Sequence, residues 1–292
     1  MHDILDRLSN ISTHPDLNIV EHINSESDLG REAAWAEYSS AKFLLLSYLL
    51  ETASMRDIHL VIMVQGEKTQ RVVERYLMGK GLLYTRPREE MGSGTNIEVS
   101  MVKDSLSFGI QTTRNDGVME TYKPPAAIIA LDKSFSSKTP TVEHMRTTFA
   151  RNGNLLPVVR LLVSNSSEHI ELCFPGLSEP ERLRTVLQYS IRLRDVVGDL
   201  QDDALGVQED AEELLSCLVS DNFNAHWSLP HIEPLHILSP EQLESSQQEL
   251  QSRPGVDIQL TNPQAQKRAF VSRPGCQMFL KCQTNIEIAG RR

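Results

Sequence analysis

Apolar positions along the first two thirds of the chain form short runs separated by helix-like stretches. The continuous run Leu60-Val61-Ile62-Met63-Val64 contains β-branched residues and is typical of a strand buried on both faces, as in parallel sheets. Apolar runs at residues 97–102, 126–131 and 155–163 predict three more strands. Strands that alternate with helices in this way favour an α/β layer fold with a mostly parallel sheet.

Helical periodicity surrounds the first predicted strand. From Ser40 onward, leucines between positions 45 and 50 repeat four residues apart and form an apolar stripe. Residues 67–78 show the same periodicity, and Gly79 and Gly81 stand where glycines end helices. Residues 104–123 are polar and irregular, so we expect a long surface loop there.

The pattern changes after Pro175, where helices replace strands. Residues 178–197 and 209–219 are predicted helices, and a third begins at Ser239, with Pro240 in its first turn. Two β-like runs follow within residues 255–288. We therefore predict a lead-in at residues 1–38, a parallel α/β domain at 39–175, and a mainly helical extension with a C-terminal tail at 176–292.

Composition narrows the class of protein. The net charge of −10 and the pI of about 5.4 disfavour a dedicated nucleic-acid binder, although a local basic stripe stays compatible with them. No apolar run approaches the roughly 20 residues that span a bilayer, and the first ten residues do not resemble a signal peptide. The 4 cysteines form no C-x-x-C pair. We expect a cytosolic or nuclear protein with reduced thiols.

Motifs that carry chemistry are incomplete. Gly66-Glu67-Lys68-Thr69 lies where a phosphate-binding loop belongs, but Glu67 replaces the glycine that must precede the lysine, and its carboxylate would repel phosphate. His226, His231 and His236 are spaced by five, without a carboxylate pattern that would support a zinc site. No G-x-S-x-G motif occurs. The sequence therefore predicts no catalytic residue, no cofactor and no metal.

Several segments, taken in order, resemble the second lobe of SNF2-type helicases. LSNISTHPDL at residues 8–17 resembles that family's L-R-K-I-C-N-H-P-x-L stretch, and LVIMVQ at residues 60–65 resembles its V-L-I-F-S-Q strand. The other similar segments are SSAKFL at 39–44, residues 72–86 with their Y-L and Y-x-R elements, AIIALD at 127–132, and residues 156–162 with Arg160. The resemblance implies a parallel-sheet lobe of the RecA-like type.

Departures from that family imply that ATP is not hydrolysed. Active members have Asp-Gly after the arginine at position 86, whereas this chain has Pro87-Arg88. The glycine-rich S-T-R loop is replaced by residues 103–109, and Thr148 takes the place of one of two arginines, which leaves Arg151. Such arginines stabilise charge on the γ-phosphate. The first lobe, with its Walker motifs, has no counterpart in the sequence.

A degenerate lobe of this kind followed by a helical extension resembles accessory subunits two and three of the fungal class II histone deacetylase complex. It also resembles the related domain of a fission-yeast adaptor that links shelterin at telomeres to heterochromatin factors. The resemblance implies a nuclear, non-enzymatic role in chromatin, with the protein subunits of such a complex as partners and no membrane.

Two functional hypotheses stay open, and a third is weaker. The first is an adaptor that docks proteins in an apolar groove between the predicted helices at 178–197 and 209–219. An acidic rim formed by Asp199, Asp202, Asp203 and Asp210 would steer a basic partner to it. The second is a sequence-nonspecific DNA-binding module that contacts phosphates through Lys42, Lys68, Arg71, Arg86, Arg88 and Arg151. The third, a lobe cut from an active remodeller, requires residues that this chain lacks. For each charged set the alternative is an ordinary solvated surface.

Overall fold

The computed structural model describes residues 2–23, 28–54, 56–82, 84–85, 106–113, 123–198, 206–220, 229 and 231–233. Its elements, in chain order, are α1 (His2–Thr13), the 3-10 turn η1 (Pro15–Asn18), α2 (Val20–Ile23), α3 (Leu29–Ser39), α4 (Ala41–Ala53), β1 (His59–Val64), α5 (Glu67–Gly79), β2 (Tyr84–Thr85), β3 (Ser107–Thr112), β4 (Ala127–Ala130), α6 (Pro140–Thr148), β5 (Val158–Arg160), α7 (Ser167–Cys173), α8 (Glu179–Leu193), the 3-10 turn η2 (Arg194–Val196) and α9 (Val207–Val219). Helices and strands alternate through the middle of the chain, as the sequence predicts.

The five described strands form one parallel sheet in the order β2-β3-β1-β4-β5. Strand β1 is central, and Ile62 lies opposite Ile110 of β3 on one side and Ile129 of β4 on the other. Every residue of β1 is buried, which is why the run from Leu60 to Val64 is apolar without alternation. The predicted parallel α/β fold is confirmed.

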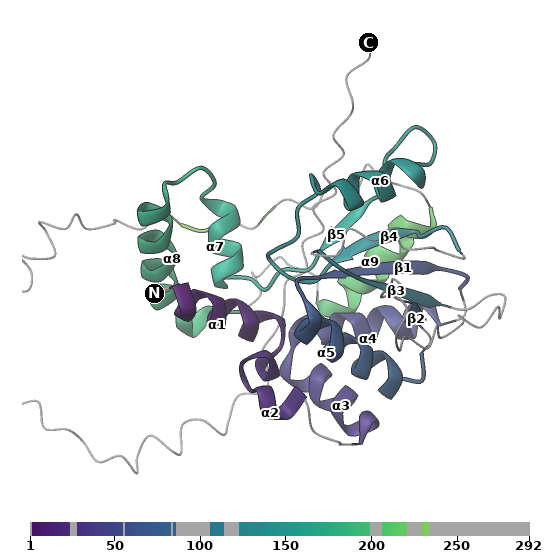
Figure 1. The fold of residues 1–292 in the computed structure, drawn as a ribbon, viewed down its shortest axis with the longest axis horizontal. Coiled ribbons are helices and arrows are strands. Elements are labelled where there is room, and N and C mark those ends of the chain that lie inside the picture. The colour runs from purple at the N-terminus through teal and green to yellow at the C-terminus, as the bar shows by residue number, and fades with distance from the viewer. Residues whose placement is uncertain are drawn as a thin grey trace, which may run out of the picture.

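Helices cover both faces of the sheet (Figure 1). On one face, Leu60, Ile62 and Val64 pack in a large core with α3, α4, α5 and α9. On the other, Val61 and Met63 pack in a smaller core with α6. The strand period of two sends alternate side chains to opposite layers, so both layers depend on the register of β1.

Strand β3 corrects the sequence prediction, which assigned residues 104–123 to a surface loop. Its residues 107–112 read Ser-Phe-Gly-Ile-Gln-Thr, and the polar members suggested exposure, yet the first five are buried. The hydroxyl of Ser107 can be buried because it finds a partner: Ser107 Oγ lies 3.0 Å from His59 Nδ1 on β1. The predicted strand at 97–102 lies outside the described residues, and the run at 155–163 contributes the shorter β5.

Helices α3 and α5 approach closely at Gly79. A Cβ added there would lie 2.2 Å from the carbonyl oxygen of Leu29 and 2.8 Å from Cβ of Ala33, so only glycine fits. Gly81 has a φ of +69°, the left-handed conformation that glycine adopts without strain after a helix. The two glycines therefore have different roles: one permits packing and the other reverses the chain.

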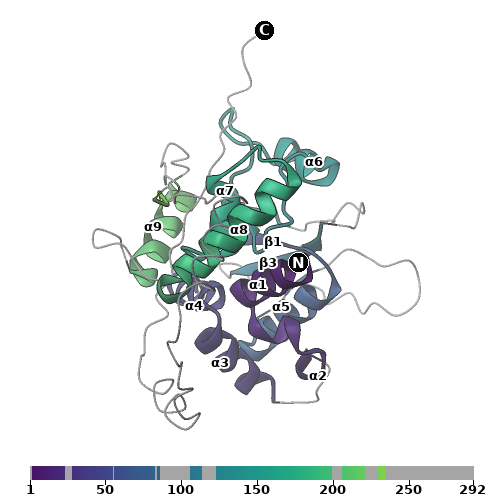
Figure 2. The ribbon, with the colours of Figure 1, turned by 90° about the vertical axis from the view of Figure 1, so that its left-hand side faces the viewer.

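The helical extension divides between two cores. Helix α9 buries Val207, Ala211 and Leu214 against α4, within the large core of the sheet. Helix α8 instead buries Val186 and Tyr189 in a third cluster with α1, α7 and Ile232. Figures 1 and 2 show α1, α7 and α8 gathered beside the α/β layers. Both predicted helices are present, and the helix predicted from Ser239 lies outside the described residues.

No helix in the described part of the chain is long and apolar enough to cross a membrane.

Acid is expected to destabilise this fold through His59. Its side chain is 3% exposed, and burial lowers its pKa from 6.5 to about 4 against a smaller opposing effect of the hydrogen bond with Ser107. Between those two pH values the unfolded chain binds more protons than the folded one, so stability falls as the pH falls from 6.5 toward 4. At pH 5 the expected loss is about 2 kcal/mol.

Urea unfolding at pH 7 and pH 5 measures this loss. In His59→Gln the side chain no longer titrates, so the difference in unfolding free energy between the two pH values should shrink by about 2 kcal/mol. Some acid sensitivity should persist, because burial also lowers the pKa of His14. An unchanged pH dependence in His59→Gln would contradict the assignment.

Candidate functional site

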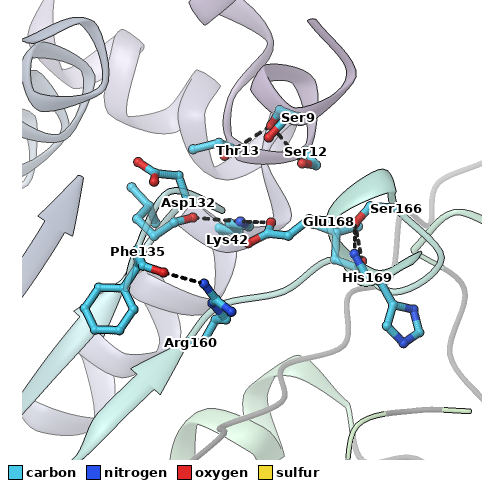
Figure 3. A network of polar contacts seen from close by, with 12 residues as sticks. Ser9, Ser12, Thr13, Lys42, Asp132, Phe135, Arg160, Ser166, Glu168 and His169 are labelled. Carbon is cyan, nitrogen blue, oxygen red and sulfur yellow. Dashed lines mark hydrogen bonds and ion pairs between the residues drawn. The ribbon is translucent and has the colours of Figure 1, made fainter. Parts of the chain in front are cut away.

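Lys42, in the first turn of α4, is a fully buried cation. Its Nζ donates to the carbonyl oxygen of Leu131, 2.7 Å away, and to Glu168 Oε2, 2.8 Å away. Glu168 lies in α7 and is 2% exposed, so both partners of the ion pair are removed from water. Figure 3 shows the pair between the end of β4 and α7. This contact ties α4, the sheet and α7 together.

A second buried charge lies at the carboxyl end of β4. The Asp132 carboxylate is 4% exposed and accepts hydrogen bonds from the backbone N–H of Gln65, at 2.5 Å, and from the N–H and hydroxyl of Ser134, at 3.1 and 2.6 Å. Gln65 follows β1, so Asp132 joins the carboxyl ends of two neighbouring strands. Both of its oxygens are used in this structural contact.

The carboxyl edge of the sheet borders a cleft of about 720 Å³, where ligands of open α/β sheets commonly bind. Its charged lining residues are mixed in sign: Asp6 and Glu67 are acidic, and Lys68 and Lys133 are basic. Lys133 Nζ lies 3.3 Å from Asp6 Oδ1 of α1, which ties α1 across this edge. Because Glu67 occupies the first turn of α5, the helix end does not favour a phosphate.

No group of three or more His, Cys, Asp or Glu side chains suited to a metal ion occurs among the residues that the structure describes. Of the three evenly spaced histidines, only His231 belongs to that part of the chain.

A comparison with protein families gives a match over most of this fold. The model described as class II histone deacetylase complex subunits 2 and 3 matches residues 1–218. The chain belongs to this family. The match confirms the resemblance to accessory subunits two and three and covers the sheet and the helices packed on it.

Relatives of the subunit 2 and 3 family agree with this assignment. "HDA1 complex subunit 3" of Eremothecium gossypii is 22% identical over 246 residues, which are 81% of this chain and 37% of that protein. The chain thus spans little more than a third of the relative's length. A chain from structural studies of the yeast class II Hda1 histone deacetylase complex has the same fold, with a TM-score of 0.65, 22% identity and coverage of 84% of this chain and 82% of that one.

A second solved structure, of fission yeast Ccq1 and Tpz1, includes a chain with a TM-score of 0.45 and 14% identity, covering 81% of this chain and 80% of that one.

The four predicted DNA-contacting residues that the structure describes do not share one surface. Lys42 is fully buried and engaged with Glu168, so the prediction that it contacts DNA is wrong. Lys68 and Arg71 are exposed on α5, beside the carboxyl end of β1. Arg151 donates to the carbonyl oxygen of Ala126, at 2.9 Å, just before β4 and hence at the opposite edge of the parallel sheet. Arg86 and Arg88 lie outside the described residues.

The predicted acidic rim also changes. Asp210 is 7% exposed, because it shares the buried side of α9 with the apolar residues that pack on α4, so its assignment to an exposed rim is wrong. Asp199, Asp202 and Asp203 lie outside the described residues. An apolar groove between α8 and α9 is likewise not formed, since the two helices bury their apolar faces in different cores.

Sequence reasoning missed Glu168. A lone glutamate after two serines carries no recognisable signal, and its partner Lys42 is 126 residues away in the chain. The signal that was present is indirect: Lys42 sits at the start of a helix that is apolar on nearly every side, so a charge there had to be paired within the fold.

Proposed function

We propose that this chain is a non-catalytic adaptor domain that docks partner proteins within a nuclear class II histone deacetylase complex. The observation that carries the proposal is the family match, which extends over residues 1–218. The partners are the other protein subunits of such a complex. A degenerate SNF2-like second lobe is the proposed origin of the α/β layers.

The geometry of the carboxyl edge supports a role without catalysis. Lys42 and Asp132 are buried charged groups at that edge, and each is engaged in contacts that hold elements of the fold together. Groups used in this way are not free to bind phosphate or to transfer protons. The cleft beside them carries charges of both signs.

The extension offers exposed apolar residues for docking. Ile191 of α8 is 61% exposed, and Val196 and Val197 just after it are 39% and 37% exposed. Large apolar side chains that lie together at the surface are typical of protein interfaces. The acidic residues that follow α8 in the sequence would favour a basic partner and add modest affinity.

Ile191→Asp is expected to weaken binding to a partner subunit of the complex by about tenfold or more, because a charge replaces an apolar contact at the interface. Co-purification of the full chain with recombinant subunits, followed by titration with the one that binds, measures the effect. Tyr38→Asp is the matched control, because Tyr38 is 85% exposed on α3, in the other part of the chain. Equal binding by wild type and Ile191→Asp would place the docking surface elsewhere.

DNA binding is the alternative function, and the exposed Lys68 and Arg71 favour it locally. Contacts to phosphates release counterions, so affinity for a generic duplex should be weak and should fall steeply with salt, and Lys68→Ala should weaken it further. Titration of a duplex at low and high salt, with an ATPase assay on the same samples, tests this. Tight duplex binding that survives high salt, or DNA-stimulated turnover, would argue against the adaptor.

A further inference from the structure

A small cavity of about 220 Å³ lies beside β5, away from the cleft that α1 borders. It is formed by the segment that joins β4 to α6, by α6 itself and by β5. Pockets that enclose drug-sized ligands usually measure about 300–1,000 Å³, so this cavity suits a single small group. Its lining residues are Phe135, Ser136, Ser137, Lys138, Arg146, Val158 and Arg160.

The charges of this lining have one sign. Lys138, Arg146 and Arg160 are cations, and none of the described residues that line the cavity is acidic. The other polar groups are the hydroxyls of Ser136 and Ser137. Ser136 Oγ accepts from the backbone N–H of Lys138, at 3.3 Å, so its own proton can be donated to a ligand. Cations and hydroxyl donors without a carboxylate favour an anion.

The position of Arg160 is fixed by strand β5 and by Phe135. Val158 packs in the smaller core with α6 and Val159 packs in the large core, so the alternation of the strand places Arg160 on the α6 side. Arg160 Nη2 donates to the carbonyl oxygen of Phe135, at 2.9 Å, and the guanidinium carbon lies 6.0 Å from the centre of the Phe135 ring (Figure 3). Because Phe135 lines the cavity, these contacts hold the guanidinium at the cavity wall.

Arg160 is half-buried and has no carboxylate partner among the described residues. Two glutamates border a second cavity that Arg160 also lines, and each of them has its own cation. Glu168 is paired with Lys42, at 2.8 Å, and Glu171 is paired with Arg182, at 3.2 Å. Charges that are withdrawn from water are normally paired, so the guanidinium is suited to an anion that binds from outside.

We propose that the cavity beside β5 binds a phosphate monoester group. Such a group carries a charge of about −1.5 to −2 at pH 7 and presents three acceptor oxygens. The guanidinium of Arg160 offers a fork of N–H donors, Lys138 adds an ammonium, and the serines add hydroxyls. A carboxylate and a phosphodiester each carry a single charge, so both match this lining less well.

The phosphate can belong to a phosphorylated serine or threonine of a bound protein segment or to a free small molecule, and both present the same chemistry. The proposal is independent of the adaptor role. It is also separate from the DNA-binding alternative, because α5, which carries Lys68 and Arg71, and α6 pack on opposite faces of the sheet.

The test follows the Nε–Hε signal of Arg160 by nuclear magnetic resonance in the full, ¹⁵N-labelled chain near pH 7, with Arg160→Lys used to assign it. Methyl phosphate is the first probe, and dimethyl phosphate and acetate are its singly charged controls. Three short peptides that differ only in a central phosphoserine, serine or glutamate form the second arm, and a generic DNA duplex forms the third. Lys138→Gln removes a charge from an exposed lining residue, and Lys68→Gln is the matched control on the other face of the sheet.

Methyl phosphate is expected to shift the Arg160 signal with a millimolar Kd, and dimethyl phosphate and acetate to bind at least about tenfold more weakly. Lys138→Gln should weaken binding of methyl phosphate by about two- to fivefold, and Lys68→Gln should leave it unchanged. Arg160→Gln, followed through the backbone signal of Lys138, should weaken it at least about tenfold. Should Arg160→Gln fail to fold, the exposed Lys138→Gln still decides.

The peptides distinguish the two sources of the phosphate. If the phosphoserine peptide binds more tightly than methyl phosphate and than its serine and glutamate counterparts, the source is a protein side chain. If methyl phosphate binds at least as tightly as the phosphoserine peptide, the source is a free small molecule. The proposal is overturned by no shift with either probe, by equal binding of acetate, or by equal effects of Lys138→Gln and Lys68→Gln. Binding of dimethyl phosphate and the duplex as tight as that of methyl phosphate would also overturn it, since the cavity would then belong to a DNA-binding surface.

Discussion

Replacing Lys42 by methionine is expected to lower the free energy of unfolding by about 3–5 kcal/mol. Methionine preserves most of the volume of the side chain but removes the ammonium, so the Glu168 carboxylate, 2% exposed, loses the cation that is paired with it. The carbonyl oxygen of Leu131 loses a donor as well. The cost comes from the uncompensated buried charge and not from the attraction within the pair, because the pair had already lost its hydration.

The double variant Lys42→Met/Glu168→Leu separates these two contributions. With both charges removed, much of the lost stability should return, since replacing a buried ion pair with apolar groups is often close to neutral. Lys68→Met, at an exposed position of α5, is the matched control and should change stability by less than about 0.5 kcal/mol. Chemical denaturation of the wild type, of Lys42→Met, of Glu168→Leu and of the double variant measures the cycle, with Lys68→Met beside them as the control. If Lys42→Met were as mild as Lys68→Met, the buried pair would not exist.

The sequence predicted those elements whose pattern directly reflects burial. The run from Leu60 to Val64 is apolar at every position because strands lie on both sides of it and helices cover both faces. The leucine stripe that follows Ser40 likewise marks α4. The periodicity of residues 209–219 predicts helix α9, but it does not predict that α9 packs on α4, because a helix that packs on a core and a helix that presents a groove have the same apolar stripe.

The wrong predictions concern residues whose burial depends on partners that are far away in the sequence. Strand β3 was assigned to a loop because Ser107 and Gln111 are polar, and only the pairing with β1 and the contact with His59 reveal why they are buried. The prediction that Lys42 contacts DNA rests on the resemblance to a helicase lobe that lies along a duplex backbone. The burial of Lys42 depends on a glutamate that the sequence pattern does not link to it. Local patterns therefore identified the elements, whereas the candidate sites depended on tertiary contacts.

Ile62→Asp is expected to abolish the cooperative unfolding of the native fold, or to cost more than about 4 kcal/mol where some fold survives. Ile62 is fully buried at the centre of β1, with Ile110 and Ile129 beside it on the neighbouring strands. An aspartate there would place a carboxylate in the large core without a cation, and its desolvation cannot be recovered by a shift of a single side chain.

Two control substitutions separate the effect of the buried charge on stability from the effects of side-chain volume and of position in the fold. Ile62→Val removes one methylene from the same site and should cost about 0.5–1.5 kcal/mol. Ile11→Asp introduces the same carboxylate on α1, where Ile11 is 53% exposed, and should change stability by no more than about 0.5 kcal/mol. Thermal and urea unfolding of the three variants give the comparison. An unchanged melting temperature for Ile62→Asp would mean that β1 is not the central strand, and the two-layer arrangement of helices built on its register would have to be abandoned with it.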